Sequence, residues 1–320
     1  MERVVKKIFK CAECKKEFEG RASLHKHLKQ HGLSMAEYYT LHYPRYNKLT
    51  GEALPFKNID HYFDRDFSTK QQLKKWCKEA PSNEVKDYIL SLIEKRQSKK
   101  ERSYAPFHLE IKSCFLPDID TYRKVFGSYN KAADLIGLRP LYHQKITAGF
   151  FTQELPSLSI AVDTREQTPL QFSGDHETKN HKLDVGDYTL FGEHYSYTFV
   201  DRKSGSDLQS TLSNKNYDRF KRELKRTKEL DSYLFVVIES TPEKIIKASR
   251  AFGRKGNIDY ILKRIRDLSY EFRGHCQFLF TGNRETSQEM ILRLLFFGKK
   301  VWETDMQYFL DHELDRRNAE

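Results

Sequence analysis

The chain has 320 residues, of which 38% are hydrophobic and 32% charged, so it can build two or three domains with proper cores. No apolar run approaches the roughly 18 residues of a membrane span, and the first nine residues are too charged and too short for a secretory signal. Five scattered cysteines do not make a disulfide framework and favour a reducing compartment. We therefore expect an intracellular protein, in the cytoplasm or nucleoid (of a host cell, if a phage encodes it), that is not secreted and has no membrane partner.

The net charge of +11 lies entirely in one half of the sequence. Residues 1–150 contain 29 Lys and Arg against 18 Asp and Glu, whereas residues 151–320 contain 27 of each. An excess of basic residues attracts polyanions, chiefly through phosphate contacts. We expect double-stranded DNA as the partner, held mainly by the N-terminal half.

Residues 1–33 have the spacing of a Cys2His2 zinc finger. The pattern C-x2-C-x12-H-x3-H places the four ligands at Cys11, Cys14, His27 and His31. Two thiolates from a turn and two imidazoles one helical turn apart can enclose Zn²⁺ as a tetrahedron, with Phe18 and Leu24 at the usual core positions. So small a unit lacks a core of its own, and the structural zinc would supply most of its folding energy.

Two uses of this finger remain open. Its helix would present Gly20, Ser23 and Lys26 to the bases, of which only Lys26 could favour guanine, over at most about 3 base pairs. Alternatively, the finger is structural and holds backbone phosphates through Arg21, Lys26 and Lys29.

Residues 34–102 are expected to be a mainly helical DNA-binding or linker region. Ser34-Met-Ala-Glu37 is a capping box that begins a helix directly after the finger. Helical spacing also covers Asp66–Cys77 and Asn83–Arg96, with Trp76 and Cys77 interpreted as core residues. The basic run at 95–102 is interpreted as a solvated linker or helix end that touches phosphate.

Residues 103–150 contain a helix-turn-helix-sized unit. Pro117 and Asp118 begin one short helix, Gly127 ends it, and a second helix then runs to Gly137. The phrase F-G-S-Y-N-K-A-A-D-L-I-G-L resembles the small repeat appended to phage and intron homing endonucleases. This resemblance implies DNA binding and makes Lys131 a candidate DNA contact, although an ordinary helical hairpin is the alternative.

Residues 151–320 are predicted to form an α/β domain whose mixed sheet is covered by helices on both faces. Ser159–Asp163 is a buried strand, and Tyr188–Phe191 and Tyr195–Val200 flank a turn at Gly192 as a hairpin. An amphipathic helix over 217–230, a strand over 234–238, two helices, a strand over 277–280 and a last helix over 286–297 follow.

This hairpin should bring Asp187, just before its first strand, close to Asp201 and Lys203 at the end of its second. Because side chains alternate along a strand, Asp201 and Lys203 share a face and Arg202 points to the other. Two carboxylates beside a lysine can hold a divalent cation and activate a water, as in the PD-(D/E)xK nucleases. A surface ion pair is the plain alternative.

Three ordered motifs carry a more specific resemblance. V-D-T-R-E at 162–166, G-D-Y at 186–188 and D-R-K-S-G-S-D at 201–207 resemble the XPF-type nuclease domain, over roughly residues 155–300. The resemblance implies a restriction-endonuclease-like fold with Mg²⁺ or Mn²⁺ at Asp187 and Asp201. The sequence departs from the family at Asp201, where the usual residue is Glu.

The resemblance also assigns roles to the neighbouring charged residues. Lys203 would orient or deprotonate the attacking water, and Asp163 and Glu166 would complete the metal shell directly or through water. Arg165 and Arg202 would form supporting ion pairs, while Asp207 would brace the lysine or cap the next helix.

These observations favour a metal-dependent DNA endonuclease of homing or site-specific type, targeted to duplex DNA by the finger and the repeat. The alternatives are a structure-specific nuclease for flap or branched DNA and a catalytically inactive DNA-binding protein. The helix-hairpin-helix module that commonly follows an XPF-type nuclease would not fit in the twenty residues after Lys300. Because cutting both strands needs two centres or two visits, a homodimer is also considered.

Overall fold

The computed structural model describes residues 8–100, 102–251 and 258–317. The chain divides into two compact units, the first of Met1–Leu92 with Phe115–Tyr129 and the second of Ile93–Cys114 with Asn130–Glu320. Within the described residues, none of the helices combines the length and the apolar character that crossing a bilayer requires. The domain boundaries predicted at residues 33, 102 and 150 do not coincide with this division and stay predictions.

The first unit begins with a ββα arrangement. Strands β1 (Phe9–Lys10) and β2 (Glu17–Phe18) pair antiparallel, and helix α1 (Arg21–His27) continues into the 3-10 turn η1 (Leu28–His31). Gly32, in the left-handed conformation, ends that turn. The predicted capping box then begins α2 (Met35–His42), where Ser34 and Glu37 exchange side-chain and backbone hydrogen bonds.

The ββα segment shares its core with the helices that follow it. Leu24 and Leu28 are buried in one cluster with Tyr38 of α2 and Tyr62 of α3 (Ile59–Asp64). The backbone N–H of Ala12 also donates to Tyr38 Oη at 2.8 Å. The hydrophobic core of the ββα segment therefore extends to α3, a helix that the sequence patterns did not predict.

The remaining helices of the first unit begin where their capping residues lie. The predicted helix from Asp66 begins instead at Lys70, because Thr69 and Gln72 form a capping box at the start of α4 (Lys70–Glu79). Asp66 accepts a hydrogen bond from Tyr88 Oη (2.8 Å) and pairs with Arg45. Helix α5 (Ser82–Ser98) follows, and the division between the units falls within it, after Leu92; Trp76 is buried as predicted.

The two predicted helices of the repeat are present with their predicted ends. Asp118 caps α7 (Ile119–Phe126) by accepting from Thr121 N, and Gly127 ends it in the left-handed conformation. Helix α8 (Tyr129–Leu135) follows, and Gly137 is again left-handed. The division between the two units falls at the start of α8, after Tyr129, so these two helices belong to different units.

The second unit is built on a six-stranded mixed sheet in the order β10-β9-β8-β7-β5-β6. Its strands are β5 (Ser159–Asp163), β6 (Glu177–His181), β7 (Tyr188–Leu190), β8 (Thr198–Lys203), β9 (Tyr233–Ile238) and β10 (Cys276–Phe280). Strand β7 runs antiparallel to both β5 and β8, while the β5–β6, β8–β9 and β9–β10 pairs are parallel. The predicted mixed α/β fold is confirmed, but β6 was missed because all five of its residues are exposed and show no apolar alternation.

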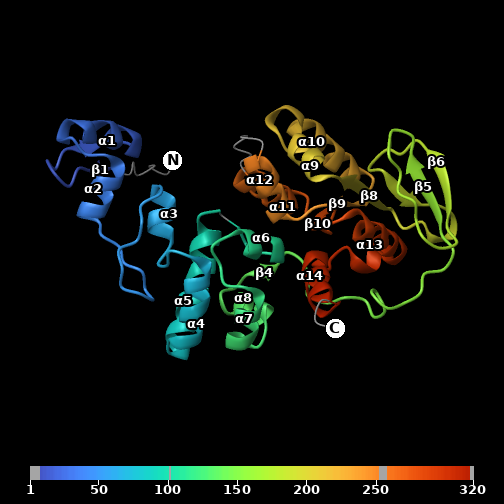
Figure 1. Cartoon of the computed structure of the whole chain (residues 1–320), viewed down its shortest axis with the longest axis horizontal. Helices are drawn as coiled ribbons and strands as arrows, with labels where there is room; N and C mark the ends of the chain where they lie inside the picture. Colours follow the sequence, from blue (N-terminus) through green and yellow to red (C-terminus); the bar gives the residue numbers. More distant parts are fainter. Residues whose placement is uncertain (1–7, 101, 252–257, 318–320) are drawn as a thin grey trace, which may run out of the picture. The chain divides into compact units, whose positions relative to one another are not determined.

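Helices cover both faces of this sheet, as predicted (Figure 1). On one face, α9 (Gly205–Thr211), α10 (Asn214–Glu229), α11 (Pro242–Ala251) and α12 (Ile258–Glu271) pack on side chains such as Leu234 and Val236. On the other, α13 (Arg284–Phe297), the 3-10 turn η3 (Gly298–Val301) and α14 (Met306–Arg317) pack on Tyr233 and Val237. A fully buried central strand such as β9 needs this cover on both sides.

The basic run at 95–102 has a different role from the predicted phosphate contact. Arg96 Nε donates to Glu110 Oε1 at 2.8 Å, and Arg102 Nη2 donates to Asp267 Oδ1 at 2.7 Å. Glu110 lies on α6 (His108–Ser113) and is fully buried. The interpretation of this run as a solvated linker is wrong for these two arginines, because a buried carboxylate must be paired. A two-stranded parallel sheet of β3 (Tyr104–Ala105) and β4 (Arg139–Pro140) completes the unit.

Candidate nuclease centre and candidate zinc site

Asp187 and Asp201 lie opposite each other on neighbouring strands. In the antiparallel β7–β8 pair, Tyr188 faces Val200, so Asp187, just before β7, and Asp201, just after Val200 on β8, lie beside each other. The Asp187 N–H donates at 2.8 Å to the carbonyl of Val200, the same residue that faces Tyr188, and so holds Asp187 against β8. The predicted convergence of these two acids through a hairpin is therefore present in the fold.

Gly186 allows this approach of the two strands. Its φ is +66°, and a Cβ at this position would lie 2.8 Å from the Val200 carbonyl oxygen, so only glycine fits without displacing a strand. Its N–H donates to Glu223 Oε1 at 3.1 Å. The glycine that precedes Asp187 thus positions both this acid and a second one on α10.

Lys203 is the counter-ion of the buried Asp201. Lys203 Nζ lies 2.9 Å from Oδ1 and 2.8 Å from Oδ2 of Asp201, a residue that is only 5% exposed. The contact to Oδ2 lacks hydrogen-bond geometry, so this oxygen has no hydrogen-bond partner in the described part of the chain. A buried carboxylate oxygen without a donor is an atom that a cation can satisfy.

The electrostatics of the centre favour binding of a cation. Burial first, then the Asp201 charge and, less strongly, Glu166, raise the pKa of Asp187 to about 8. Burial opposes the charge of Lys203, but Asp201, Asp187 and Glu223 together raise the pKa of this lysine above its usual value. The lysine is therefore charged at neutral pH, while one of the carboxylates holds a proton when no metal is present.

The remaining predicted acids are held by arginines. Asp163 accepts four hydrogen bonds: Oδ1 from Arg165 N and Nε, and Oδ2 from Arg165 Nη2 and Leu183 N, at 2.6–3.1 Å. Two carboxylate oxygens offer about four acceptor sites, so this set leaves little capacity for a metal. The arrangement favours a supporting role for Asp163 over direct ligation.

Arg202, on β8, pairs with two acids and holds Asp187 through its backbone. It donates to Glu166 Oε1 at 3.0 Å and to Glu239 Oε2 at 3.1 Å, while its backbone N–H donates to Asp187 Oδ2 at 2.8 Å. Asp207 caps α9, with Ser204 Oγ donating to it at 2.6 Å, so of its two suggested roles the structure shows the cap. Direct ligation of metal by Glu166 stays a prediction.

Glu223 is an acid of this centre that the sequence analysis missed. It lies on α10 between the buried Phe220 and Leu224, and burial, followed by the charge of Asp201, raises its pKa. The sequence does indicate that Glu223 faces the sheet, because it lies three residues after Phe220 and four residues before Thr227, both of which are buried. An acid on the inward stripe of an amphipathic helix indicates a buried polar site.

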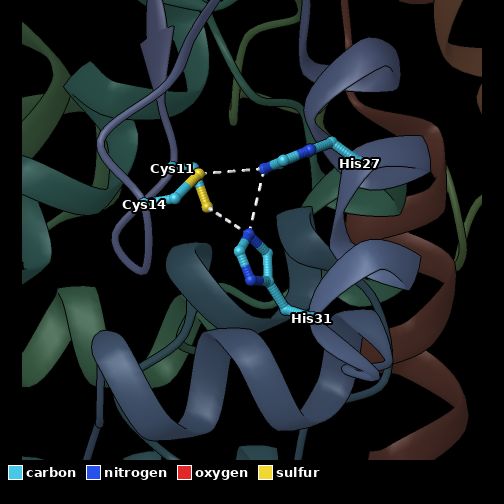
Figure 2. A group of neighbouring side chains, drawn as sticks. All are labelled: Cys11, Cys14, His27 and His31. Carbon is cyan, nitrogen blue, oxygen red and sulfur yellow. Dashed lines mark hydrogen bonds between the residues drawn. The ribbon is translucent and has the colours of Figure 1, made fainter.

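The four predicted zinc ligands converge in the first unit (Figure 2). One ligand atom from each of Cys11, Cys14, His27 and His31 lies within 4.8 Å of the others, and no second group of three or more such ligands occurs among the described residues. His27 Nε2 is 3.1 Å from Cys14 Sγ and 3.0 Å from His31 Nε2. Such spacings surround a point about 2.0–2.3 Å from each atom, the usual Zn–N and Zn–S lengths.

His27 also has the outer contact typical of a metal ligand. Its Nδ1 lies 2.8 Å from Gln30 Oε1, which fixes Nδ1 as the protonated nitrogen and leaves Nε2 free for a metal. The candidate phosphate contacts of the finger, Arg21, Lys26 and Lys29, are all exposed, as is Lys131 on α8. The residues present therefore fit a structural zinc ion.

Comparison with known proteins places a nuclease likeness in the second unit. Residues 162–294 match the family model described as the ERCC4 domain, so this part of the chain is similar to the XPF-type nuclease domain. The matched range contains all the predicted residues of the acidic centre and Glu223, and it excludes the candidate zinc site and the predicted repeat. No curated relative matches the chain.

Two solved structures also match part of the chain. XPF from Aeropyrum pernix is 16% identical with a TM-score of 0.32, and the same protein in complex with DNA is 17% identical with a TM-score of 0.30. In both, the alignment covers 43% of this chain and 63% of the other, so the chain spans less than two thirds of these structures.

Proposed function

We propose that the protein is a metal-dependent DNA endonuclease that hydrolyses phosphodiester bonds at Asp187, Asp201 and Lys203. The observation that carries this proposal is the register of the β7–β8 hairpin, which brings the half-buried Asp187 beside the buried Asp201, with Lys203 on the same face as Asp201. The ERCC4-domain match over residues 162–294 independently supports a nuclease.

The acids fit Mg²⁺ or Mn²⁺ by their chemistry. Magnesium binds through one or two carboxylates and otherwise keeps its waters or takes phosphate oxygens. Asp201 Oδ2 without a hydrogen bond and Asp187 with its raised pKa both gain from a nearby cation. When bound, the metal supplies positive charge that offsets the charge developing on the phosphate and eases deprotonation of water.

The protein's own groups then orient the reaction. Lys203 carries a proton at neutral pH, so it suits a role in orienting water and stabilising the charged phosphate better than a role as a base. Arg202 and Gly186 fix the two strand ends on which the acids lie.

Targeting is proposed to lie in the other half of the chain. The excess of basic residues within 1–150, the candidate zinc finger and the helices of the homing-type repeat support binding to duplex DNA. A homodimer would supply a second centre for the second strand. These features favour an intracellular, site-specific enzyme.

A structure-specific nuclease for flap or branched DNA is the second candidate, and the likeness to the XPF-type domain favours it. Both candidates are tested by incubating the full chain and Mg²⁺ with linear duplex, flap and junction substrates of the same sequence. We expect metal-dependent cleavage that Asp187→Asn and Lys203→Ala each abolish, while DNA affinity stays within a few-fold. Full activity in either variant would disprove the proposed centre, and cleavage of branched substrates alone would decide for the second candidate.

A further inference from the structure

A groove of about 650 Å³ opens on the sheet beside the candidate nuclease centre. Ala161 of β5, Thr189 of β7 and Phe199 of β8 line it, together with the exposed edge strand β6. On this face of the sheet the helices pack over β8, β9 and β10. The groove lies at the other end of the face, over β5 and β6. We call this feature the β5–β6 groove.

The groove and the acids lie on the same face of the sheet. Ala161 is two residues before Asp163, Thr189 two after Asp187 and Phe199 two before Asp201, so each pair points to one side. Two strand residues span about 7 Å, close to two steps of a stacked nucleic-acid strand at about 3.4 Å each. Leu183, which lines the groove, also donates its N–H to Asp163 at 2.7 Å. The groove thus lies two residues along the same strands from the acids of the candidate centre.

Two exposed tyrosines stand at the groove. Tyr195 and Tyr197 are 40% and 47% exposed, and their ring centroids are 4.8 Å apart. Tyr197 has a φ of +57°, a conformation that costs a non-glycine residue on the order of 1 kcal/mol or more. The Tyr197 carbonyl accepts from Tyr233 N at 3.0 Å, at the start of the β8–β9 pairing, while its half-exposed ring lines the groove as an aromatic surface.

Basic side chains accompany the rings. Lys179 and Lys182 line the groove, and Lys299 Nζ lies 5.0 Å from the centre of the Tyr197 ring. Lys179 pairs with Glu177 at 2.8 Å, but both side chains are more than half exposed, and such pairs contribute little. The lining acid Asp184 is paired with Arg226. Aromatic rings for bases beside lysines for phosphates are the pattern of single-strand nucleic-acid sites.

We propose that the β5–β6 groove binds unpaired nucleotides of the DNA next to the bond that is cut, with their bases stacked on Tyr195 and Tyr197. This inference rests on the proposed nuclease function and adds a binding site to it. A fully paired duplex keeps its bases stacked inside the helix, so it cannot use these rings. A strand that is unpaired beside the cut can stack its bases on these rings. The groove therefore favours DNA with unpaired nucleotides beside the cut over fully paired duplex.

The first experiment locates the bound base directly. A duplex with a short unpaired segment carries 5-iodouracil within that segment, and it is irradiated with the full-length protein in buffer without added divalent cations. We expect mass spectrometry to find the crosslink at Tyr195 or Tyr197. Crosslinks confined to residues 1–150 would overturn the proposal, because the base would then be bound by the basic half alone.

The second experiment measures selectivity by fluorescence anisotropy, with the gapped duplex and a fully paired duplex of the same sequence. In the double variant Tyr195→Leu/Tyr197→Leu, the affinity ratio of gapped to paired DNA should fall about fivefold or more, the lower end of base–aromatic stacking. The matched variant Tyr195→Phe/Tyr197→Phe keeps both rings and should retain the wild-type ratio. An unchanged ratio in the leucine variant would overturn the proposal.

The two experiments distinguish failure of the groove proposal from failure of the nuclease proposal. If the wild-type protein cleaves no substrate with Mg²⁺ or Mn²⁺ but still crosslinks at the groove, the nucleotide site stands and the nuclease proposal falls. If it cleaves DNA but crosslinks only elsewhere, the nuclease stands and the groove proposal falls.

Discussion

Replacement of Asp187 by Asn tests the electrostatics of the centre without any nuclease assay. Asp187 is half-buried beside Asp201, and its Oδ2 accepts a hydrogen bond from Arg202 N at 2.8 Å. Asparagine has the same shape, and its amide oxygen can accept the same bond. The substitution therefore removes one ionisable group and keeps the local geometry.

The expected effect follows from linkage between the proton and folding. The pKa of Asp187 is about 8 in the folded protein, against 3.8 for an ordinary aspartate, and one pKa unit corresponds to about 1.36 kcal/mol. Below pH ~4 the acid is neutral in both states, so the wild type and Asp187→Asn should be equally stable. Between pH ~4 and ~8 only the unfolded wild type releases the proton, so its stability falls as pH rises. Above pH ~8 the variant should be more stable by up to the order of 5 kcal/mol.

The assay should follow the second unit alone. The chain has two tryptophans, so a Trp76→Phe background leaves Trp302, which stacks on Tyr233, as the reporter of unfolding. Urea unfolding without added divalent cations is compared at pH 5, 7 and 9. Asp184→Asn is the control, since Asp184 lies three residues earlier with a side chain that is 64% exposed. A difference between Asp187→Asn and the wild type that does not grow with pH would refute the reasoning.

Two further predictions concern the metals. Glu223→Gln keeps an acceptor for Gly186 N but removes a charge close to Asp201. The affinity for Mn²⁺, measured calorimetrically, should therefore weaken roughly tenfold, or about 1.4 kcal/mol. An unchanged affinity would show that Glu223 is not part of the centre. Zinc removal with a selective chelator, or Cys14→Ser, should abolish hydrogen-exchange protection in α1, α2 and α3, because these helices share the cluster around Tyr38. Strands β8 and β9 should keep their protection. Cys77→Ser, outside the cluster, is the control, and loss confined to the first 33 residues would contradict the shared core.

Much of the second unit could be predicted because its signals are local. The continuous apolar run of β9 and the β-branched and aromatic residues at the start of β8 indicate strands whichever partners they pair with, and Gly192 marks the turn between β7 and β8. The convergence of Asp187 and Asp201 then follows from hairpin geometry alone. Capping residues likewise fixed the starts of α2 and α7.

The missed features depend on contacts that the sequence does not state. Strand β6 is held by its backbone pairing with β5 and shows no apolar pattern. The basic run at 95–102 looked solvated because its partners, Glu110 and Asp267, are distant in the chain. Glu223 could have been noticed on its helix stripe, but its approach to Asp201 requires the helix to be placed on the sheet.

Glu223 also bears on the one departure of this sequence from the XPF-type motif. Asp201 stands where that motif has Glu, so its carboxylate ends one methylene closer to the strand, and Lys203 contacts both of its oxygens. A cation at the centre must then share Asp201 with the lysine. Glu223 approaches the centre from α10: burial and then the Asp201 charge raise its pKa, and its Oε1 accepts from Gly186 N. A longer acid from the helix therefore lies close to the shorter acid on the strand. If the proposed cation binds, Glu223 would add negative charge at the centre that offsets Lys203, although Asp201 is the shorter residue.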